Sequence, residues 1–227
     1  MASVRKIPVQ TRSVAGYFYS VKNRRNIDFE SQLEKKFYLT FEFNDEIERY
    51  QEQPVKVETA LNGRKITYIP DCLIYFKPEL NKNPLLVEIK YLKEIKEKKE
   101  KIVNKVKAVS KYCKENGFLF KIFTDKKLDE TYINNIKFLY RYSERPKSNG
   151  KYEEYENRIY SVLYGNDLTV GELLNITALN DSERMTILPV IWHLAFKKKL
   201  SLNLNKPLNN AVIAALNKEV ENDTVFA

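Results

Sequence analysis

Residues 68–76 read YIPDCLIYF, and residues 85–92 read LLVEIKYL. Short runs of branched and aromatic apolar residues between turn-forming residues are typical of buried strands, so we expect a strand in each stretch. Pro70 has no amide proton to donate to a sheet, which predicts an edge or a bulge at this point. A bulge there would re-aim the carboxylate of Asp71, which follows directly. The sequence therefore predicts an acid beside an irregularity in a strand over residues 65–76.

The second stretch places two opposite charges on one face of its strand. Glu88 and Lys90 are two residues apart, and successive side chains of a strand point to opposite faces, so these two share a face. A cross-strand ion pair explains either residue taken alone, and taken alone it is the preferred explanation. With the preceding Pro-Asp, however, the pattern becomes P-D followed by E-x-K on consecutive predicted strands. This combination points to a metal-dependent phosphodiesterase.

A third acid lies in a predicted helix from Phe29 to Phe43, where large apolar side chains recur at every fourth position. Ser31 stands three residues before Glu34, which is the spacing of a capping box, so one explanation of Glu34 is local bonding at the start of the helix. Glu34 also borders the apolar face, where an acid is costly unless it is paired or holds a metal. On this stretch alone the local explanation is preferred, and the explanation as a metal ligand is carried forward.

These residues have the chemistry that phosphodiester hydrolysis requires. Hard cations such as Mg²⁺ take oxygen ligands, and two or three carboxylates plus a backbone carbonyl, here that of Ile89, suit them. Such an ion polarises the scissile phosphate and lowers the pKa of a bound water. A lysine supplies a compact positive charge that stabilises charge developing on phosphorus. Asp71, Glu88 and Lys90 can take these roles.

The neighbouring segments predict the rest of an α/β domain. Residues 47–57 alternate like a strand, and Asn62-Gly63 is a hairpin signal before the strand that carries Asp71. A helix over residues 93–116, ended by Gly117 and with its charges in solvent, and a buried strand over 118–123 predict a crossover with parallel pairing. With a last helix over 129–140, residues 29–141 form an α-β-β-β-α-β-α domain: a mixed sheet flanked by helices.

Composition limits the class of protein. The chain has 227 residues, enough for one good core and a smaller second domain, and its 43% hydrophobic and 30% charged residues are ordinary for a soluble protein. No apolar run approaches a membrane span, and the first residues lack the apolar core of a secretion signal. Two cysteines without partner ligands predict neither a zinc site nor a disulfide framework, so a reducing cytoplasm fits best.

The formal net charge of +9 favours a polyanionic partner, although a lysine-rich genome bias explains such a surplus equally well. Residues 1–28 form an expected basic arm with interleaved aromatics, which can follow a phosphate backbone or remain a solvated tail. The candidates for DNA contact in the arm are Arg12, Lys22, Arg24 and Arg25.

A second domain is predicted after a linker at residues 142–150, which gathers proline, serine, asparagine and glycine. Residues 151–227 should hold a helix over 152–164, a short helix opened by the capping box of Thr169 and Glu172, and a third opened by Asn180 or Asp181. An alternating segment at 200–204 resembles a wing strand, so a small, mainly α, winged-helix-like domain is expected.

The third helix of this domain ends in a run of lysines, of which Lys197 and Lys198 are candidates for DNA contact. Pro189 removes a backbone hydrogen bond inside the same helix and kinks it. A protein-docking or backbone-contacting role is therefore preferred to base readout. His193 lies among apolar neighbours and is expected to serve packing rather than catalysis.

The order of these elements, with its P-D and E-x-K pieces, resembles the PD-(D/E)xK restriction-endonuclease fold. More closely, the chain resembles the TnsA family, the endonuclease subunits of heteromeric transposases. The resemblance is carried by Arg12-Ser13, Gly16-Tyr17-Phe18, Ser20, Lys22 and Arg25, and then by FESQLEKKFYLTFEF, QEQPVKV, YIPDCLIYF and LLVEIKYL. It covers nearly all of residues 12–92 and extends to about residue 141 through KIFTDKKL and INNIKFLY. Ala15 departs from it, because the family often has an arginine or a similar polar residue there.

The resemblance implies a set of site residues. In the family the acid of the E-S-x-L-E motif is a metal ligand, which corresponds to Glu34, and the remaining positions correspond to Asp71, Glu88 and Lys90. Some members have glutamine in place of the first E-x-K acid, whereas this chain has the fuller carboxylate form. Mg²⁺ is the implied cofactor, with Mn²⁺ as a substitute.

The resemblance also implies a reaction and partners. The reaction is hydrolytic nicking of the 5′, non-transferred strand at the ends of a transposon in cut-and-paste transposition. A DDE-type transposase subunit, TnsB, cuts the 3′ ends, and an AAA+ regulator, TnsC, is the other expected partner. Two alternatives remain: a stand-alone restriction or repair nuclease, and a non-catalytic DNA-binding assembly subunit. A bacterial cytoplasm, with association to the nucleoid during the reaction, is the expected location.

Overall fold

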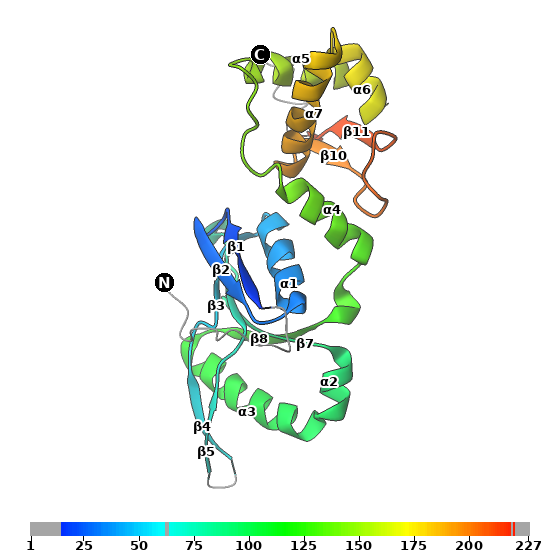
Figure 1. Cartoon of the computed structure of the whole chain (residues 1–227). Coiled ribbons are helices and arrows are strands. Elements are labelled where there is room, and N and C mark those ends of the chain that lie inside the picture. Colours follow the sequence, from blue (N-terminus) through cyan, green and yellow to red (C-terminus); the bar gives the residue numbers. More distant parts are fainter. Residues whose placement is uncertain (1–14, 62–63, 219, 221–227) are drawn as a thin grey trace. The chain divides into compact units, whose positions relative to one another are not determined.

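The structure, a computed structural model, describes residues 15–61, 64–218 and 220. The chain divides into two compact units, residues 1–128 and 129–227 (Figure 1). This division lies before the predicted linker at 142–150, so the helix predicted at 129–140 falls in the second unit and not in the nuclease domain. Within the described residues, no helix is both long and apolar enough to cross a membrane.

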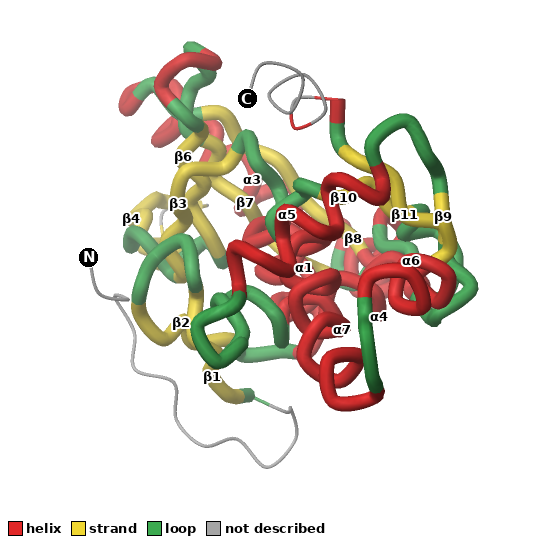
Figure 2. Tube along the Cα trace, turned by 90° about the horizontal axis from the view of Figure 1, so that it is seen from above, coloured by secondary structure: helices red, strands yellow, loops and turns green. Residues whose placement is uncertain are grey.

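A mixed four-stranded sheet forms the centre of the first unit. Its order is β3, β6, β7, β8, with antiparallel pairing except between β7 and β8, which are parallel, and Figure 2 shows β3, β6 and β7 as neighbours. Two helices, α2 and α3, connect the parallel pair, which confirms the predicted crossover. The bounds are β3 Ile47–Glu52, β6 Cys72–Phe76, β7 Leu85–Lys90, α2 Leu92–Glu97, α3 Lys99–Asn116 and β8 Leu119–Thr124, with short 3₁₀ turns at Pro78–Leu80 and Asp125–Lys127.

Helices cover both faces of this sheet. The helix α1 (Gln32–Phe43) packs its phenylalanines on one face, where Val87 and Ile89 of β7 point. Val109 and Cys113 of α3 pack on the other face with apolar residues of β6 and β7. Because alternate side chains of a strand enter opposite layers, β7 is apolar almost throughout. The unit is therefore the α/β, restriction-endonuclease-like fold that the strand order predicted.

Both long predicted strands are broken in the structure. The stretch 47–57 ends as a strand at Glu52 because Gln53 takes a left-handed backbone with φ of 42° before Pro54. The stretch 65–76 is interrupted by Ile69-Pro70-Asp71, which separates β5 (Arg64–Tyr68) from β6. The strands β4 (Val57–Leu61) and β5 instead form a separate ribbon, which Figure 1 shows beside α3. Proline thus ends a strand here and does not create a bulge within one.

Part of the predicted arm is folded. The strands β1 (Gly16–Ser20) and β2 (Arg25–Phe29) make an antiparallel hairpin, and Ile27 and Phe29 are buried in the core with α1. Gly16 lies so close to the Phe29 ring that a Cβ at this position would be 2.9 Å from it. Residues 16–29 are therefore not a solvated tail, one of the two alternatives for the basic arm over 1–28; the alternation of their apolar residues is too short to recognise in the sequence.

The buried carboxylate of Glu42 in α1 holds the turn of this hairpin. It accepts hydrogen bonds from the Ser20 hydroxyl, from the backbone amides of Val21 and Lys22 at 3.0 and 3.2 Å, and from the Tyr50 hydroxyl at 2.8 Å. Four donors compensate the cost of burying the charge. The hairpin is thereby fixed to α1 and β3.

Among the residues that the structure describes, the second unit contains the helices α4 to α7 and a three-stranded antiparallel sheet in the order β10, β11, β9. Thr169 and Glu172 form the predicted capping box, Asn180 caps α7, and Pro189 lies inside α7. His193 is buried, with Nδ1 at 2.7 Å from the Tyr142 carbonyl oxygen, and burial lowers its pKa. The bounds are α4 Glu130–Tyr140, α5 Tyr152–Leu163, β9 Leu168–Thr169, α6 Val170–Thr177, α7 Asp181–Phe196, β10 Leu200–Leu202 and β11 Ile213–Leu216.

Packing explains why α4 belongs to this unit. The Phe138 ring meets the Trp192 ring of α7 edge-on with their centroids 5.2 Å apart. The buried amide of Asn135 donates to the carbonyl oxygens of Leu204 and Lys206 at 2.8 and 2.7 Å. The sequence period of α4 predicts its apolar face, but it does not show which element packs against that face.

Candidate active site

Asp71, Glu88 and Lys90 meet at the first residues of β6 and the last residues of β7. Since Cys72 of β6 pairs with Val87 of β7, Asp71 comes opposite the E-x-K segment. Oδ2 of Asp71 accepts from the Ile89 amide at 2.6 Å and lies 3.3 Å from Nζ of Lys90. The same ammonium lies 3.2 Å from Oε1 of Glu88. The structure therefore brings the predicted P-D and E-x-K residues together around one lysine.

The backbone of Asp71 is held from two other elements. Its carbonyl oxygen accepts from the Gln53 amide at 2.9 Å and from the Tyr38 hydroxyl at 3.1 Å. Tyr38 belongs to α1 and is fully buried, and Gln53 directly follows β3. The irregular segment around Pro70 thus has its carbonyl group satisfied without belonging to a strand.

Glu34 bonds at the start of its own helix, as one of the two sequence explanations predicted. Its carboxylate accepts from the Glu30 amide and from the Ser31 hydroxyl, each at 2.8 Å, while Ser31 caps the Glu34 amide at 3.2 Å. Burial and the nearby charge of Asp71 nevertheless raise its pKa to about 7. Glu34 is therefore a capping residue whose pKa is also raised by the nearby carboxylate of Asp71.

In the cluster of Asp71, Glu88 and Lys90, two acidic side chains share one positive charge. Burial, and then the neighbouring Glu88, raise the pKa of Asp71 to about 7, although Lys90 and the Ile89 amide act in the opposite direction. Burial acts to lower the pKa of Lys90, but Asp71 and Glu88 outweigh it, so this pKa is raised and the ammonium stays charged. Two close carboxylates with one lysine form a site that an additional positive charge would stabilise.

The donor atoms fit a hard divalent cation, since all of them are carboxylate or carbonyl oxygens. Ile89, expected to contribute its carbonyl oxygen, accepts there from Lys90 Nζ at 3.1 Å. Within the part of the chain that the structure describes, however, no three acidic, histidine or cysteine side chains are grouped closely enough to hold a metal ion. Asp71 and Glu88 are together, whereas Glu34 lies at the start of α1, where each of its carboxylate oxygens accepts one hydrogen bond and keeps one lone-pair direction.

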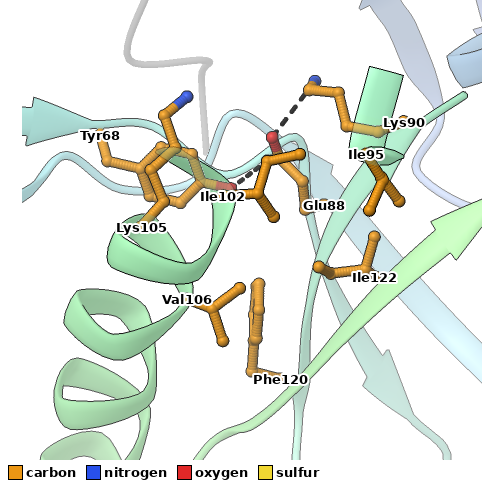
Figure 3. A pocket seen from close by; sticks show the side chains of 9 residues that line it. All are labelled: Tyr68, Glu88, Lys90, Ile95, Ile102, Lys105, Val106, Phe120 and Ile122. Carbon is orange, nitrogen blue, oxygen red and sulfur yellow. Dashed lines mark hydrogen bonds and ion pairs between the residues drawn. The ribbon is translucent and has the colours of Figure 1, made fainter. Parts of the chain in front are cut away.

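Tyr68, the last residue of β5, is a further residue of the site that was not among the predicted ones. Its hydroxyl donates to Oε2 of Glu88, and the contact is drawn in Figure 3. The Lys105 ammonium of α3 lies 5.0 Å from the centre of the Tyr68 ring. These side chains line a small cavity with apolar residues of α2, α3 and β8: Ile95, Ile102, Val106, Phe120 and Ile122. Nothing in the spacing of Tyr68 indicates this contact, because the break at Pro70 creates it.

The basic candidates for DNA contact differ in their surroundings. Arg12 lies outside the described residues. Nζ of Lys22 donates to the Ile47 carbonyl at 2.6 Å, and Arg25 pairs through its two terminal guanidinium nitrogens with the buried Glu52 at 2.6 and 2.5 Å. These contacts make Lys22 and Arg25 part of the hairpin's attachment to the sheet, whereas Arg24 in the turn is exposed.

In the second unit, Lys197 is exposed, with its ammonium 5.6 Å from the centre of the Phe196 ring. Lys198 is half-buried and takes a left-handed backbone with φ of 55°. Exposure therefore leaves Lys197 better placed than Lys198 to reach a phosphate.

Comparison with known proteins agrees with this geometry. No curated protein matches the chain. The model described as TnsA-like endonuclease N terminal matches residues 44–125, which include Asp71, Glu88 and Lys90 but not Glu34. The model described as TnsA endonuclease C terminal matches residues 128–204, and its start agrees with the structural division after Leu128. With the acid and lysine cluster in the first matched region and the helical unit in the second, the chain belongs to the TnsA endonuclease family.

Proposed function

We propose that this chain hydrolyses the 5′, non-transferred strand at transposon ends and that the reaction depends on Mg²⁺ or Mn²⁺. The observation that carries the proposal is the partly buried contact of Asp71 and Glu88 with the Lys90 ammonium, at 3.3 and 3.2 Å. Structural ion pairs also occur in cores, but a second acid beside Asp71 raises its pKa and costs stability. A site kept at such a cost is typical of catalysis.

Asp71 and Glu88 would hold the cation, with the carbonyl oxygen of Ile89, and Glu34 would join them from α1. When bound, the cation polarises the phosphate and favours ionisation of the attacking water. The charged Lys90 faces the same site and stabilises the negative charge that develops on a phosphate oxygen as the water attacks phosphorus and the opposite phosphorus–oxygen bond breaks. The bonds from Ile89 and Tyr38 orient Asp71 before substrate arrives.

The second unit is proposed to be a winged-helix-like domain that docks to protein. Its order of α5, β9, α6, α7 and a final β-hairpin supports the winged-helix assignment. The first turn of α7, the helix that would read DNA bases, carries Asp181 and Glu183, and negative charge there disfavours a phosphate backbone. The family implies a DDE-type transposase, TnsB, and an AAA+ regulator, TnsC, as the proteins to test for binding.

The catalytic proposal is tested with the assembled transposase subunits and transposon-end DNA labelled separately on each strand. Asp71→Asn and Lys90→Ala should each reduce 5′-strand nicking at least about 100-fold, whereas 3′-strand cleavage should continue. Lys93→Ala is the matched control, because Lys93 is a solvent-exposed lysine three residues away. Chelation of divalent ions should abolish nicking. Undiminished 5′ nicking by both site variants would refute the proposal.

A further inference from the structure

The side chain of Glu88 is fixed by contacts on both of its oxygen atoms. Oε1 lies 3.2 Å from Nζ of Lys90, and Oε2 accepts the hydroxyl proton of Tyr68. Glu88 is 7% exposed and Tyr68 is 6% exposed, so water competes little for the hydrogen bond between them. The carboxylate plane is therefore set by the two partners together.

Tyr68 is itself rigidly placed. Its ring packs in the apolar cluster on the α3 face of the sheet, with Leu73, Val109 and Cys113, and the Lys105 ammonium covers it at 5.0 Å. Figure 3 shows the hydroxyl directed at Glu88 from the side opposite Lys90. Tyr68 lies at the end of the β4–β5 ribbon, only three residues before Asp71, so one short segment supplies both an acid of the site and a partner for the other acid.

The contact leaves Glu88 able to bind a cation. Each carboxylate oxygen has two lone-pair directions, and one donor on each oxygen still leaves acceptor capacity on both. Carboxylates that hold metals are commonly oriented by such outer hydrogen bonds, and loss of one typically weakens metal binding or activity by about 10- to 100-fold. A tyrosine suits this task because its hydroxyl can donate while its ring is anchored in the core.

We propose that Tyr68 is a positioning residue for the nuclease site: its buried hydroxyl orients the Glu88 carboxylate for metal binding, opposite the Lys90 ammonium. The inference rests on the proposed function, since it assigns to Glu88 the role of a ligand. Tyr68 acts through Glu88 and does not itself contact the substrate. Lys105 acts one step further out, by holding the ring.

The test is Mn²⁺ binding to the full-length protein, measured by isothermal titration calorimetry without DNA. Tyr68→Phe removes the hydroxyl and keeps the ring, and we expect Mn²⁺ affinity to fall about 10-fold. Tyr112→Phe is the matched control. Tyr112 packs against the same apolar cluster, where its ring contacts Phe118, and no contact with Glu88 is found among the described residues. With partners and DNA present, kcat for 5′ nicking should fall by a similar factor while KM for DNA stays unchanged.

A double-substitution cycle separates orientation of Glu88 from a general structural effect. In a Glu88→Gln background, Tyr68→Phe should have no further effect on Mn²⁺ affinity, because the group that it orients is already lost. Two results would overturn the role of Tyr68 but leave the proposed nuclease site standing. One is an equal loss of Mn²⁺ affinity from Tyr68→Phe in both backgrounds. The other is wild-type Mn²⁺ affinity in Tyr68→Phe when Glu88→Gln binds Mn²⁺ more weakly. Wild-type Mn²⁺ affinity and nicking in Glu88→Gln would instead refute the proposed site itself.

Discussion

Asp71→Asn should stabilise the protein in neutral and alkaline solution. The pKa of Asp71 is raised from an ordinary value of 3.8 to about 7 by burial and by Glu88. An acid whose pKa is raised by folding lowers the free energy of unfolding when it is ionised. This loss is absent below the unfolded-state pKa, grows as pH rises, and is complete above the folded-state pKa. At about 1.4 kcal/mol per pKa unit, a shift of roughly three units corresponds to about 4 kcal/mol.

Asparagine removes this penalty, in which the attraction of Lys90 is already included, and keeps an oxygen for the Ile89 amide. We therefore expect the free energy of unfolding of the first unit to rise by roughly 2 to 4 kcal/mol at about pH 8 and to change little at about pH 4. Urea unfolding followed by far-ultraviolet circular dichroism measures the difference. The protein's one tryptophan, Trp192, lies in the second unit, so its fluorescence gives an internal control whose midpoint should not move.

Two results would refute this reasoning. One is a lower stability of Asp71→Asn than of the wild type at about pH 8. The other is an equal difference at both pH values, which would show that the effect does not come from ionisation of the acid. Loss of nicking alone does not distinguish these cases, because it is expected on catalytic grounds.

Three further substitutions test the fold. Arg25→Ala leaves the Glu52 carboxylate, whose side chain is 3% exposed, without its bidentate partner and should cost about 2 to 4 kcal/mol in urea unfolding, whereas Arg24→Ala should change stability by less than about 0.5 kcal/mol. Asn135→Ala should cost about 2 to 3 kcal/mol and speed protease cleavage of the loop that contains residues 204–208, since the amide bonds this loop three times; equal cleavage rates would contradict the assigned role. Gly117→Ala, at φ of 69°, should cost about 1 kcal/mol in thermal unfolding, and no loss would show that the end of α3 relaxes.

The parts of the fold that could be predicted are those whose chemistry shows within a short window of sequence. The serine cap and apolar period of α1, the glycine at the end of α3 and the parallel crossover into β8 follow from local rules. The contact of Glu88 with Lys90 followed from the two-residue period of a strand. Proximity of Asp71 to both required only the assumption that consecutive strands pair.

The features of the fold that could not be predicted depend on the points at which the chain changes direction. The left-handed backbone at Gln53 and the break at Pro70 divide two expected strands into four, and these breaks bring Tyr68 to Glu88. The role of the buried carboxylate of Glu42 could not be predicted, because two of its donors are backbone amides of the hairpin turn and the hydroxyl donors Ser20 and Tyr50 are distant in sequence. The place of α4 in the second unit likewise depends on which apolar face covers its stripe, which periodicity does not encode.

The bonds to the carbonyl oxygen of Asp71 have a practical consequence. Because Gln53 and Tyr38 hold the main chain at this point, its path does not depend on what the side chain carries. Asp71→Asn should therefore give a folded protein that lacks the acid. If the proposed function holds, such a variant would still join its partners on transposon-end DNA and leave the 5′ strand uncut, which would give a complex suited to imaging.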